Sequence, residues 1–380
     1  MSFNSVRPWM VVALVLLVYL GLIFFTNDHD PKTFVSIGSC FSQCTGEDGE
    51  NCDVPDDATL EEQFEIEGYD GQFNYYIARD PDNAAPCIDV PAYRYQRILL
   101  PFLGYLLSMG TEEAVPWTFV VINALALILS TRLLEGLLET EGRKRWFALS
   151  YGLFFGLVIS VRLSTSEPLA YGLVLVGIWA YQRQYLWLMT VALGLAGLAK
   201  ETTGIMTAGF VLYFALNRRW QEVARLVLLA GLPFFLWQLY LYDWFGETGM
   251  GSGGAKATSF EIVPFLGVIK IGTEGGIAAF LLLGVLLVGI PVVLPTLWGL
   301  RESWKDFRQR KISLYTCLLL TSAVIMPFVP FSTYREFLGI FRFIPGLVMM
   351  VVLYSAERNL RRPLMYSTLW IVLLMFLTVG

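Results

Sequence analysis

The 380-residue sequence has few charged residues and almost no histidine. Charged side chains make up 16% of the chain and hydrophobic residues 56%, whereas ordinary soluble domains carry roughly 25% charged residues. This scarcity of charge argues against a soluble enzyme. The single histidine, His29, has no partners for a catalytic triad, so histidine-dependent chemistry is not expected. No His, Cys and Asp residues have the spacing of metal ligands, so no cofactor is assigned and a need for a divalent metal stays open.

Long apolar runs make up most of the chain. A run of about 18 or more apolar residues with few charges is typical of a transmembrane helix. The first run follows Arg7 and lacks a small-residue cleavage site, so we expect it to be retained as a span. The sequence predicts an all-α polytopic membrane protein, a single transmembrane domain over 1–380. It has about eleven spans, at 9–25, 116–135, 146–161, 168–182, 185–199, 202–217, 225–245, 277–299, 312–330, 337–355 and 364–380.

Half of the acidic residues lie in one polar segment after the first span. Between residues 27 and 97 there are 16 Asp and Glu but only 4 Lys and Arg. Four of the five cysteines lie there too: Cys40, Cys44, Cys52 and Cys87. Four cysteines in one polar loop are typical of two disulfides in an oxidising compartment, with three connectivities open. We therefore predict that loop 27–115 is extracytoplasmic.

The basic residues test this topology, because Lys and Arg gather in short cytoplasmic connections. With Arg7 inside, 17 basic residues fall on the cytoplasmic side and 10 outside. If 185–217 were one long span, every later connection would lie on the opposite side of the membrane and its basic residues would fall outside. We therefore favour two short helices that meet at Lys200 and Glu201. The sequence thus predicts a cytoplasmic N-terminus and an extracytoplasmic C-terminus in a prokaryotic plasma (inner) membrane.

Two further segments differ from simple spans. The apolar segment 97–110 would be only about 21 Å long as a helix, too short for a hydrocarbon core of roughly 30 Å. It is predicted to lie at the outer interface as an amphipathic helix. The glycine-rich segment 246–276 lacks the spacing of a phosphate-binding loop and is predicted to be a flexible external loop.

Several external charges lie where solvation alone does not explain them. Arg162 and Glu167 flank a tight turn, and Arg342 interrupts an apolar run. Ionisable groups at membrane depth are costly and usually face a cavity or a partner. Two structural alternatives stay open: ion pairs Arg162–Glu167 or Lys200–Glu201, and snorkelling of Arg342 to the headgroups.

The acidic loop ends in a short motif around Asp70. The sequence EGYDGQFNYYIARDP predicts a helix that begins after Asp70 and ends before Pro81. Asp70 is then suited to cap this helix, a role that needs no chemistry. The many tyrosines of the loop are explained most simply as a membrane-interface belt.

Three features follow one another along the chain: a large loop after the first span with G-Y-D-x-x-x-x-Y-x-I-A-R, an interfacial helix near R-I-L-x-P, and a later A-K-E-T between short spans. This layout resembles the GT-C superfamily of membrane glycosyltransferases. In protein O-mannosyltransferases and aminoarabinose transferases, an acidic motif stands at the corresponding place in the first loop. Gly71 follows Asp70 where many members have a second acid, which leaves that acid's role open.

The resemblance implies transfer of a sugar from a polyprenyl phosphate to an acceptor hydroxyl of a glycan, lipid or protein, with inversion at the anomeric carbon. Asp70 would be the general base. The cations implied to bind the lipid phosphate are Lys200, Arg342, Arg162, Arg97, Arg94 and Arg335. The residues implied to orient them or to contact sugar or acceptor are Glu201, Glu167, Tyr69, Gln72, Tyr76 and Asp80. We expect Asp70, Lys200 and Arg342 to converge on one cavity, and we expect membrane lipids but no nucleic acid as partners.

Two other classes of function stay open. Intramembrane charges also mark the paths of transporters, so a flippase for lipid-linked sugars is one alternative. Transporters commonly contain repeated pairs of broken helices, and the sequence has one short pair, at 185–217. The other alternative is a noncatalytic subunit of an envelope-polymer assembly, with the acidic loop as its docking surface.

Overall fold

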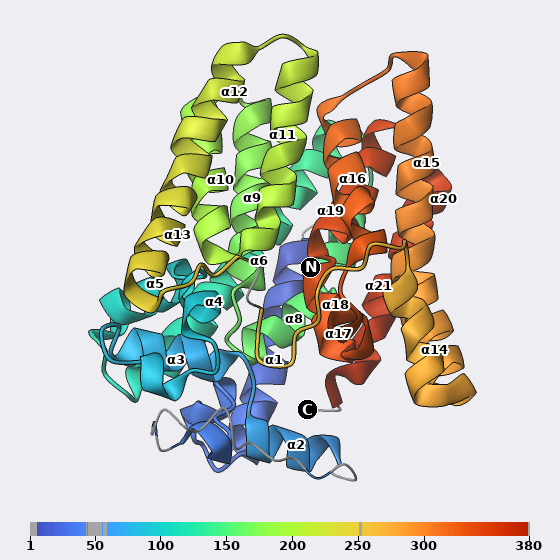
Figure 1. The fold of residues 1–380 in the computed structure, drawn as a ribbon. Coiled ribbons are helices and arrows are strands. Elements are labelled where there is room, and N and C mark those ends of the chain that lie inside the picture. The colour runs from blue at the N-terminus through green and yellow to red at the C-terminus, as the bar shows by residue number, and fades with distance from the viewer. Residues whose placement is uncertain (1–5, 43, 45–54, 56–58, 251–252, 379–380) are drawn as a thin grey trace.

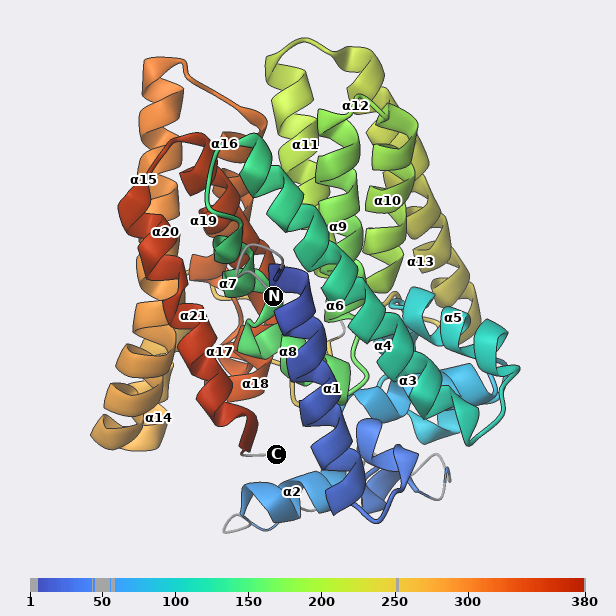
Figure 2. The same ribbon diagram turned by 180° about the vertical axis from the view of Figure 1, so that it is seen from behind.

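The computed structural model describes residues 6–42, 44, 55, 59–250 and 253–378, whose regular structure is helical (Figures 1 and 2). An isolated β-bridge joins Ile37 and Gly68. The α-helices are α1 (Pro8–Thr26), α2 (Leu60–Glu67), α3 (Gly71–Arg79), α4 (Pro91–Tyr95), α5 (Leu99–Ser108), α6 (Ala114–Thr140), α7 (Leu149–Gly152), α8 (Phe155–Arg162), α9 (Glu167–Gln182), α10 (Leu186–Ala199), α11 (Gly204–Leu216), α12 (Trp220–Leu226), α13 (Leu232–Phe245), α14 (Leu266–Ala279), α15 (Leu294–Gln309), α16 (Leu314–Ile325), α17 (Phe331–Arg335), α18 (Phe337–Phe343), α19 (Pro345–Glu357), α20 (Arg361–Ser367) and α21 (Leu369–Val372).

Within these ranges, four helical stretches are long and apolar enough to cross a membrane. They are α1, α6, the stretch Trp220–Phe245 and the stretch Leu266–Gln309. Helices α18 and α19, bent by 44° at their junction, add a fifth if they form one broken span. The predicted α-helical membrane protein is therefore confirmed in its fold class.

The other predicted spans coincide with shorter helices, so the count of eleven stays a prediction. Helices α9, α10, α11 and α16 have between 12 and 16 residues. The predicted break at Lys200 is present, because its extended backbone (φ −156°, ψ 121°) separates α10 from α11.

Helices α9, α16 and α19 form the interior of the bundle. Helix α19 is buried on all sides from Pro345 to Ala356, whereas only 11% of the apolar window of α1 is buried. A helix that is apolar all round and buried on all sides belongs to the core. In Figure 1, α9, α16 and α19 lie between α13 on one side and α14 and α15 on the other.

The elements of the acidic loop gather at one end of this bundle. Helices α2 to α5 lie there in both views (Figures 1 and 2), and α5 is the short helix predicted over 97–110. A disulfide joins Cys44 to Cys87, 43 residues apart, which confirms a disulfide in this loop, while Cys52 lies outside the described residues. The turns α11–α12 and α15–α16, rich in Arg and Lys, lie at the opposite end (Figure 1).

The external loop predicted over 246–276 is shorter in the structure. Helix α14 begins at Leu266 and contains the last eleven of these residues. The glycines of this stretch suggested a loop, but Gly267 serves close packing. A Cβ atom at Gly267 would lie 2.9 Å from the ring of Tyr334.

A glycine also sets the contact between α8 and α18. A Cβ atom at Gly156 would lie 2.1 Å from the carbonyl oxygen of Phe341. We expect Gly156→Ala to destabilise the protein by about 1–3 kcal/mol, because the two backbones must move apart. The measurement is thermal unfolding of the protein in detergent micelles.

The matched control is Gly197→Ala in α10. Nothing lies within 4 Å of a Cβ atom added there, and alanine is favoured over glycine in a helix by up to about 1 kcal/mol. Equal melting temperatures for the two variants would contradict the packing argument.

Candidate functional site

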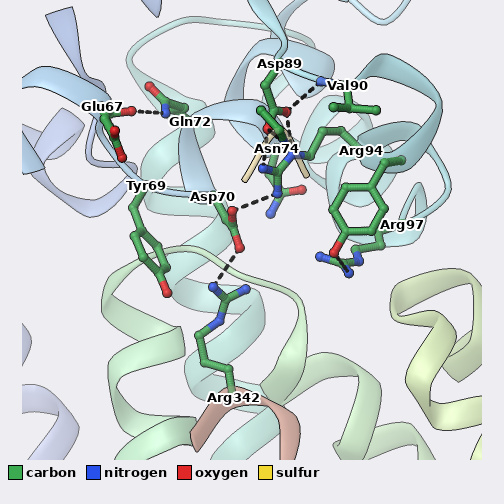
Figure 3. Close-up of polar contacts among 12 residues, drawn as sticks. Glu67, Tyr69, Asp70, Gln72, Asn74, Asp89, Val90, Arg94, Arg97 and Arg342 are labelled. Carbon is green, nitrogen blue, oxygen red and sulfur yellow. Dashed lines mark hydrogen bonds and ion pairs between the residues drawn. The ribbon is translucent and has the colours of Figure 1, made fainter. Parts of the chain in front are cut away.

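Asp70 lies between α2 and α3, and its carboxylate contacts two arginines. Oδ1 accepts a hydrogen bond from Arg94 Nη1 at 2.7 Å, and Oδ2 accepts one from Arg342 Nη1 at 2.6 Å (Figure 3). Asp70 does occupy the N-cap position of α3, but its side chain makes no capping hydrogen bond. The capping role that helix rules suggest is therefore wrong, and the carboxylate is free to bridge two cations.

Helix α3 is held tightly against the turn that joins α8 to α9. The side-chain amide of Asn74 donates to the carbonyl of Ser164 at 2.9 Å. A Cβ atom at Gly71 would lie 2.1 Å from the carbonyl oxygen of Leu163. Position 71 therefore has no room for the second acid that the resemblance led us to look for.

Arg94 on α4 is fixed by a second acid that sequence analysis missed. Its Nε and Nη2 atoms donate to the two oxygens of Asp89, each at 2.7 Å. Its guanidinium group also lies 4.3 Å from the centre of the Phe73 ring. A forked pair of this kind sets the orientation of the arginine as well as its charge, so Arg94 presents Nη1 to Asp70 in a fixed direction.

Arg342 approaches the same carboxylate from α18, near the other end of the chain. Its Nε donates to Glu167 Oε1 at 2.8 Å, while Nη1 contacts Asp70. Its guanidinium group lies over the ring of Tyr69, 5.0 Å from the ring centre. Arg342 is therefore a buried bridge between two carboxylates and does not snorkel to the headgroups.

The remaining charges pair differently from the two alternatives weighed above. Lys200 Nζ donates to Glu167 Oε1 at 2.5 Å, and Arg97 forms a forked pair with Glu201 at 2.7 and 2.8 Å. The pairs Arg162–Glu167 and Lys200–Glu201 are not among the ion pairs of the described residues. Glu167 and Glu201 therefore pair with other cations than these, and Arg162 forms no ion pair among the described residues.

These side chains line one small pocket. Asp70, Lys200 and Arg342 converge on it as expected, together with Arg94, Arg97, Glu167, Asn74, Thr165 and Ser166. Four of the lining side chains are basic and two are acidic, and Asp89 and Glu201 pair with Arg94 and Arg97 from outside the lining. Four acids therefore balance the four cations, and an added anion has to compete with these acids for them.

The arginines also set the charge state of Asp70. Burial opposes its ionisation, but Arg94, Arg342 and Arg97 outweigh burial and hold the pKa of Asp70 well below its ordinary value. A carboxylate with so low a proton affinity is a poor base. Asp70 gains basicity only if one of these cations finds another anion.

Other residues assigned from the sequence lie away from the pocket. Gln72 links Gly38 and Glu67, the Tyr76 hydroxyl donates to the carbonyl of Phe41, and Asp80 accepts from Asn83 within a turn. Their polar groups stabilise the loop, and their contact with sugar or acceptor stays a prediction.

Three more assigned residues also lie outside the lining. Arg162 is buried at the end of α8, and its Nε has no hydrogen-bond partner among the described residues. Arg335 lies over the ring of Phe331. The Tyr69 hydroxyl donates to Glu336 at 3.0 Å, while the Tyr69 ring packs against Arg342. Of the six cations proposed for the phosphate, the pocket therefore contains Arg94, Arg97, Lys200 and Arg342.

In the part of the chain that the structure describes, no group of three or more His, Cys, Asp or Glu side chains is arranged to hold a metal ion. Sequence analysis missed Asn74, Thr165 and Ser166, which line the pocket, and Asp89, which holds Arg94 from outside the lining. Each is an ordinary polar residue in the sequence, and only the tertiary fold brings it to the charged cluster.

The buried acid Glu167 yields a stability prediction. We expect Glu167→Gln to destabilise the protein by about 3–5 kcal/mol, because Lys200 keeps its charge but loses its counterion. The double variant Glu167→Gln, Lys200→Met removes both charges and should recover part of the loss. Thermal unfolding in detergent micelles measures both effects, and an unchanged melting temperature for Glu167→Gln would contradict the pairing.

The charged pocket has to be interpreted from its own chemistry: no family model, curated protein or solved structure matches this chain.

Proposed function

We propose that this protein is a membrane glycosyltransferase of the GT-C type. In this proposal eleven spans hold the pocket at the extracytoplasmic face, where a sugar passes from a polyprenyl phosphate to an acceptor hydroxyl. The observation that carries the proposal is the Asp70 carboxylate, held between Arg94 and Arg342 in a pocket lined by four basic side chains. A base next to several phosphate-binding cations is what this transfer requires.

The lipid phosphate is the anion proposed for the cationic wall. Arg342 and Lys200 approach the pocket from helix ends within the bundle, while Arg94 and Arg97 belong to the loop. Phosphate accepts charge-assisted hydrogen bonds from several cations at once. The four basic groups then neutralise the charge that develops on the phosphate as the sugar leaves.

Donor binding also activates Asp70 in this mechanism. The phosphate competes with Asp70 for Arg94 and Arg342, and weakening either contact raises the proton affinity of the carboxylate. The acceptor oxygen attacks the anomeric carbon, its proton passes to Asp70, and the bond from the anomeric carbon to the phosphate oxygen breaks. The phosphate stays on the lipid, and a single displacement of this kind inverts the anomeric centre.

The side of the membrane is inferred from the two ends of the bundle. The pocket lies near α3 and α4, at the end that holds the Cys44–Cys87 disulfide. Turns with Arg218, Arg219, Arg310 and Lys311 lie at the opposite end. Basic connections favour the cytoplasm and disulfides favour an oxidising compartment, so both features support an extracytoplasmic pocket.

The first test removes the proposed base. Asp70→Asn should lower sugar transfer from polyprenyl-phosphate sugars by at least about 100-fold, the lower range for loss of a general base. The fold should persist, because Arg94 keeps Asp89 and Arg342 keeps Glu167. The assay uses protein in reconstituted vesicles and a panel of donor sugars.

The matched control for this variant is Asp80→Asn, which alters an aspartate of the same loop outside the pocket. It should transfer sugar at the unaltered rate. Full activity of Asp70→Asn would contradict the base assignment. If the unaltered protein moves lipid-linked sugars across the membrane without transferring the sugar to an acceptor, the result would support a transporter and contradict a glycosyltransferase.

A second test concerns topology, using the two ends of α6. A membrane-impermeant thiol reagent applied to intact spheroplasts should label Glu113→Cys, whereas Lys144→Cys should be labelled only after permeabilisation. Both positions are exposed, and the chain without either substitution is the control for background labelling. The reverse pattern would place the pocket in the cytoplasm and overturn the orientation.

A further inference from the structure

The turn between α8 and α9 is held by its backbone. The amide of Asn74 donates to the carbonyl of Ser164, and the amide of Asn123 donates to the carbonyl of Thr165 at 3.0 Å. Ser164 has a left-handed backbone conformation (φ 50°), which is unfavourable for residues other than glycine. Two buried asparagines from α3 and α6 therefore fix a strained turn at the wall of the pocket.

The side chains of this turn are poorly bonded, although its backbone is well bonded. Among the described residues, Ser166 Oγ has no hydrogen-bond partner, whereas the Thr165 hydroxyl interacts with the Glu167 carboxylate. All three residues are buried, with exposed fractions of 1%, 4% and 0%, and all three line the pocket. Buried polar atoms nearly always have a partner, so we expect the Ser166 hydroxyl to find its partner in a bound ligand.

Ser166 gives a second sign that its hydroxyl is not used by the fold. It occupies the N-cap position of α9, where a serine side chain normally accepts a hydrogen bond from the helix backbone. No such bond forms, and Pro168 in the first turn has no amide hydrogen to give. The Ser166 hydroxyl is therefore available to the pocket.

The chemistry of the turn favours neutral hydroxyl groups over a phosphate. Glu167 Oε1 already accepts from Lys200 and Arg342, while Oε2 accepts from neither of them. The proposed phosphate binds these two cations, so the Oε2 side of the carboxylate suits a neutral donor better than an anion. A sugar hydroxyl donates to a carboxylate oxygen, and it both donates to and accepts from Ser and Thr hydroxyls.

We infer that residues 165–167 form a subsite for the hydroxyl groups of the donor sugar, with Ser166 as the residue that contributes most to its recognition. This inference rests on the proposed function, because it places the sugar next to a phosphate held by Arg342 and Lys200. It adds a wall of neutral recognition, separate from the cations and from Asp70.

The experiment compares binding of two kinds of lipid to the full chain in nanodiscs. One is polyprenyl phosphate alone, and the other is a panel of polyprenyl phosphates that carry mannose, glucose or galactose. The unaltered protein should bind at least one sugar-bearing lipid more tightly than the bare lipid. Ser166→Ala should reduce this advantage by about five- to tenfold, the factor for one neutral hydrogen bond, with no change for the bare lipid.

Two further variants make the result decisive. Thr165→Val removes a hydroxyl but keeps the shape of the side chain, and it should also reduce the advantage. Ser160→Ala is the control, because the Ser160 hydroxyl is buried in α8 and donates to the carbonyl of Gly156. It should leave both affinities unchanged.

The outcomes separate the two proposals. An equal sugar advantage in the unaltered protein, Ser166→Ala and Thr165→Val would overturn the subsite alone. Equal affinity of the unaltered protein for bare and sugar-bearing lipids would also overturn the subsite and leave the proposed function standing. Failure of the unaltered protein to bind polyprenyl phosphate in any form would contradict the proposed function, and the subsite with it.

Discussion

The arrangement of the site depends on one carboxylate shared by two arginines. Arg94 reaches Asp70 from the loop, and Arg342 reaches it from the bundle. Each arginine has a second acid, Asp89 or Glu167, so the charges form a chain of alternating sign across the boundary between loop and bundle. Removing one partner from a buried chain of this kind leaves another charge without compensation. The acidic loop is therefore tied to the membrane domain by charge as well as by packing.

The general plan of the protein follows from the sequence because it depends on local composition. Apolar runs indicate helices, and the predicted break at Lys200 is where the chain turns. Span lengths follow less directly, because helices buried in protein need not match the bilayer, as α16 with its 12 residues illustrates. The loop predicted over 246–276 was too long, since glycine serves packing at Gly267 and composition does not distinguish this from flexibility.

The sequence named the central residues of the site but not their partners. Lys200 and Arg342 stood out because a charge is costly near a membrane, and Asp70 stood out because its motif resembles that of a known family. Their partners come from distant segments: Lys200 pairs with Glu167, 33 residues away, and not with the adjacent Glu201. Asp89 and Ser166 gave no signal, because an isolated aspartate or serine has no pattern of its own. Their importance arises from burial, which the tertiary fold decides.

The span of sequence between Asp70 and its two arginines has a consequence for biosynthesis. Arg94 follows Asp70 by 24 residues, but Arg342 follows it by 272. At about 5–20 residues per second, the ribosome adds Arg342 tens of seconds after the Asp70 segment. A nascent chain therefore first holds the loop without the contact from Arg342, and the pocket is complete only once α18 has been made. Premature termination before α18 leaves the acid with Arg94 alone.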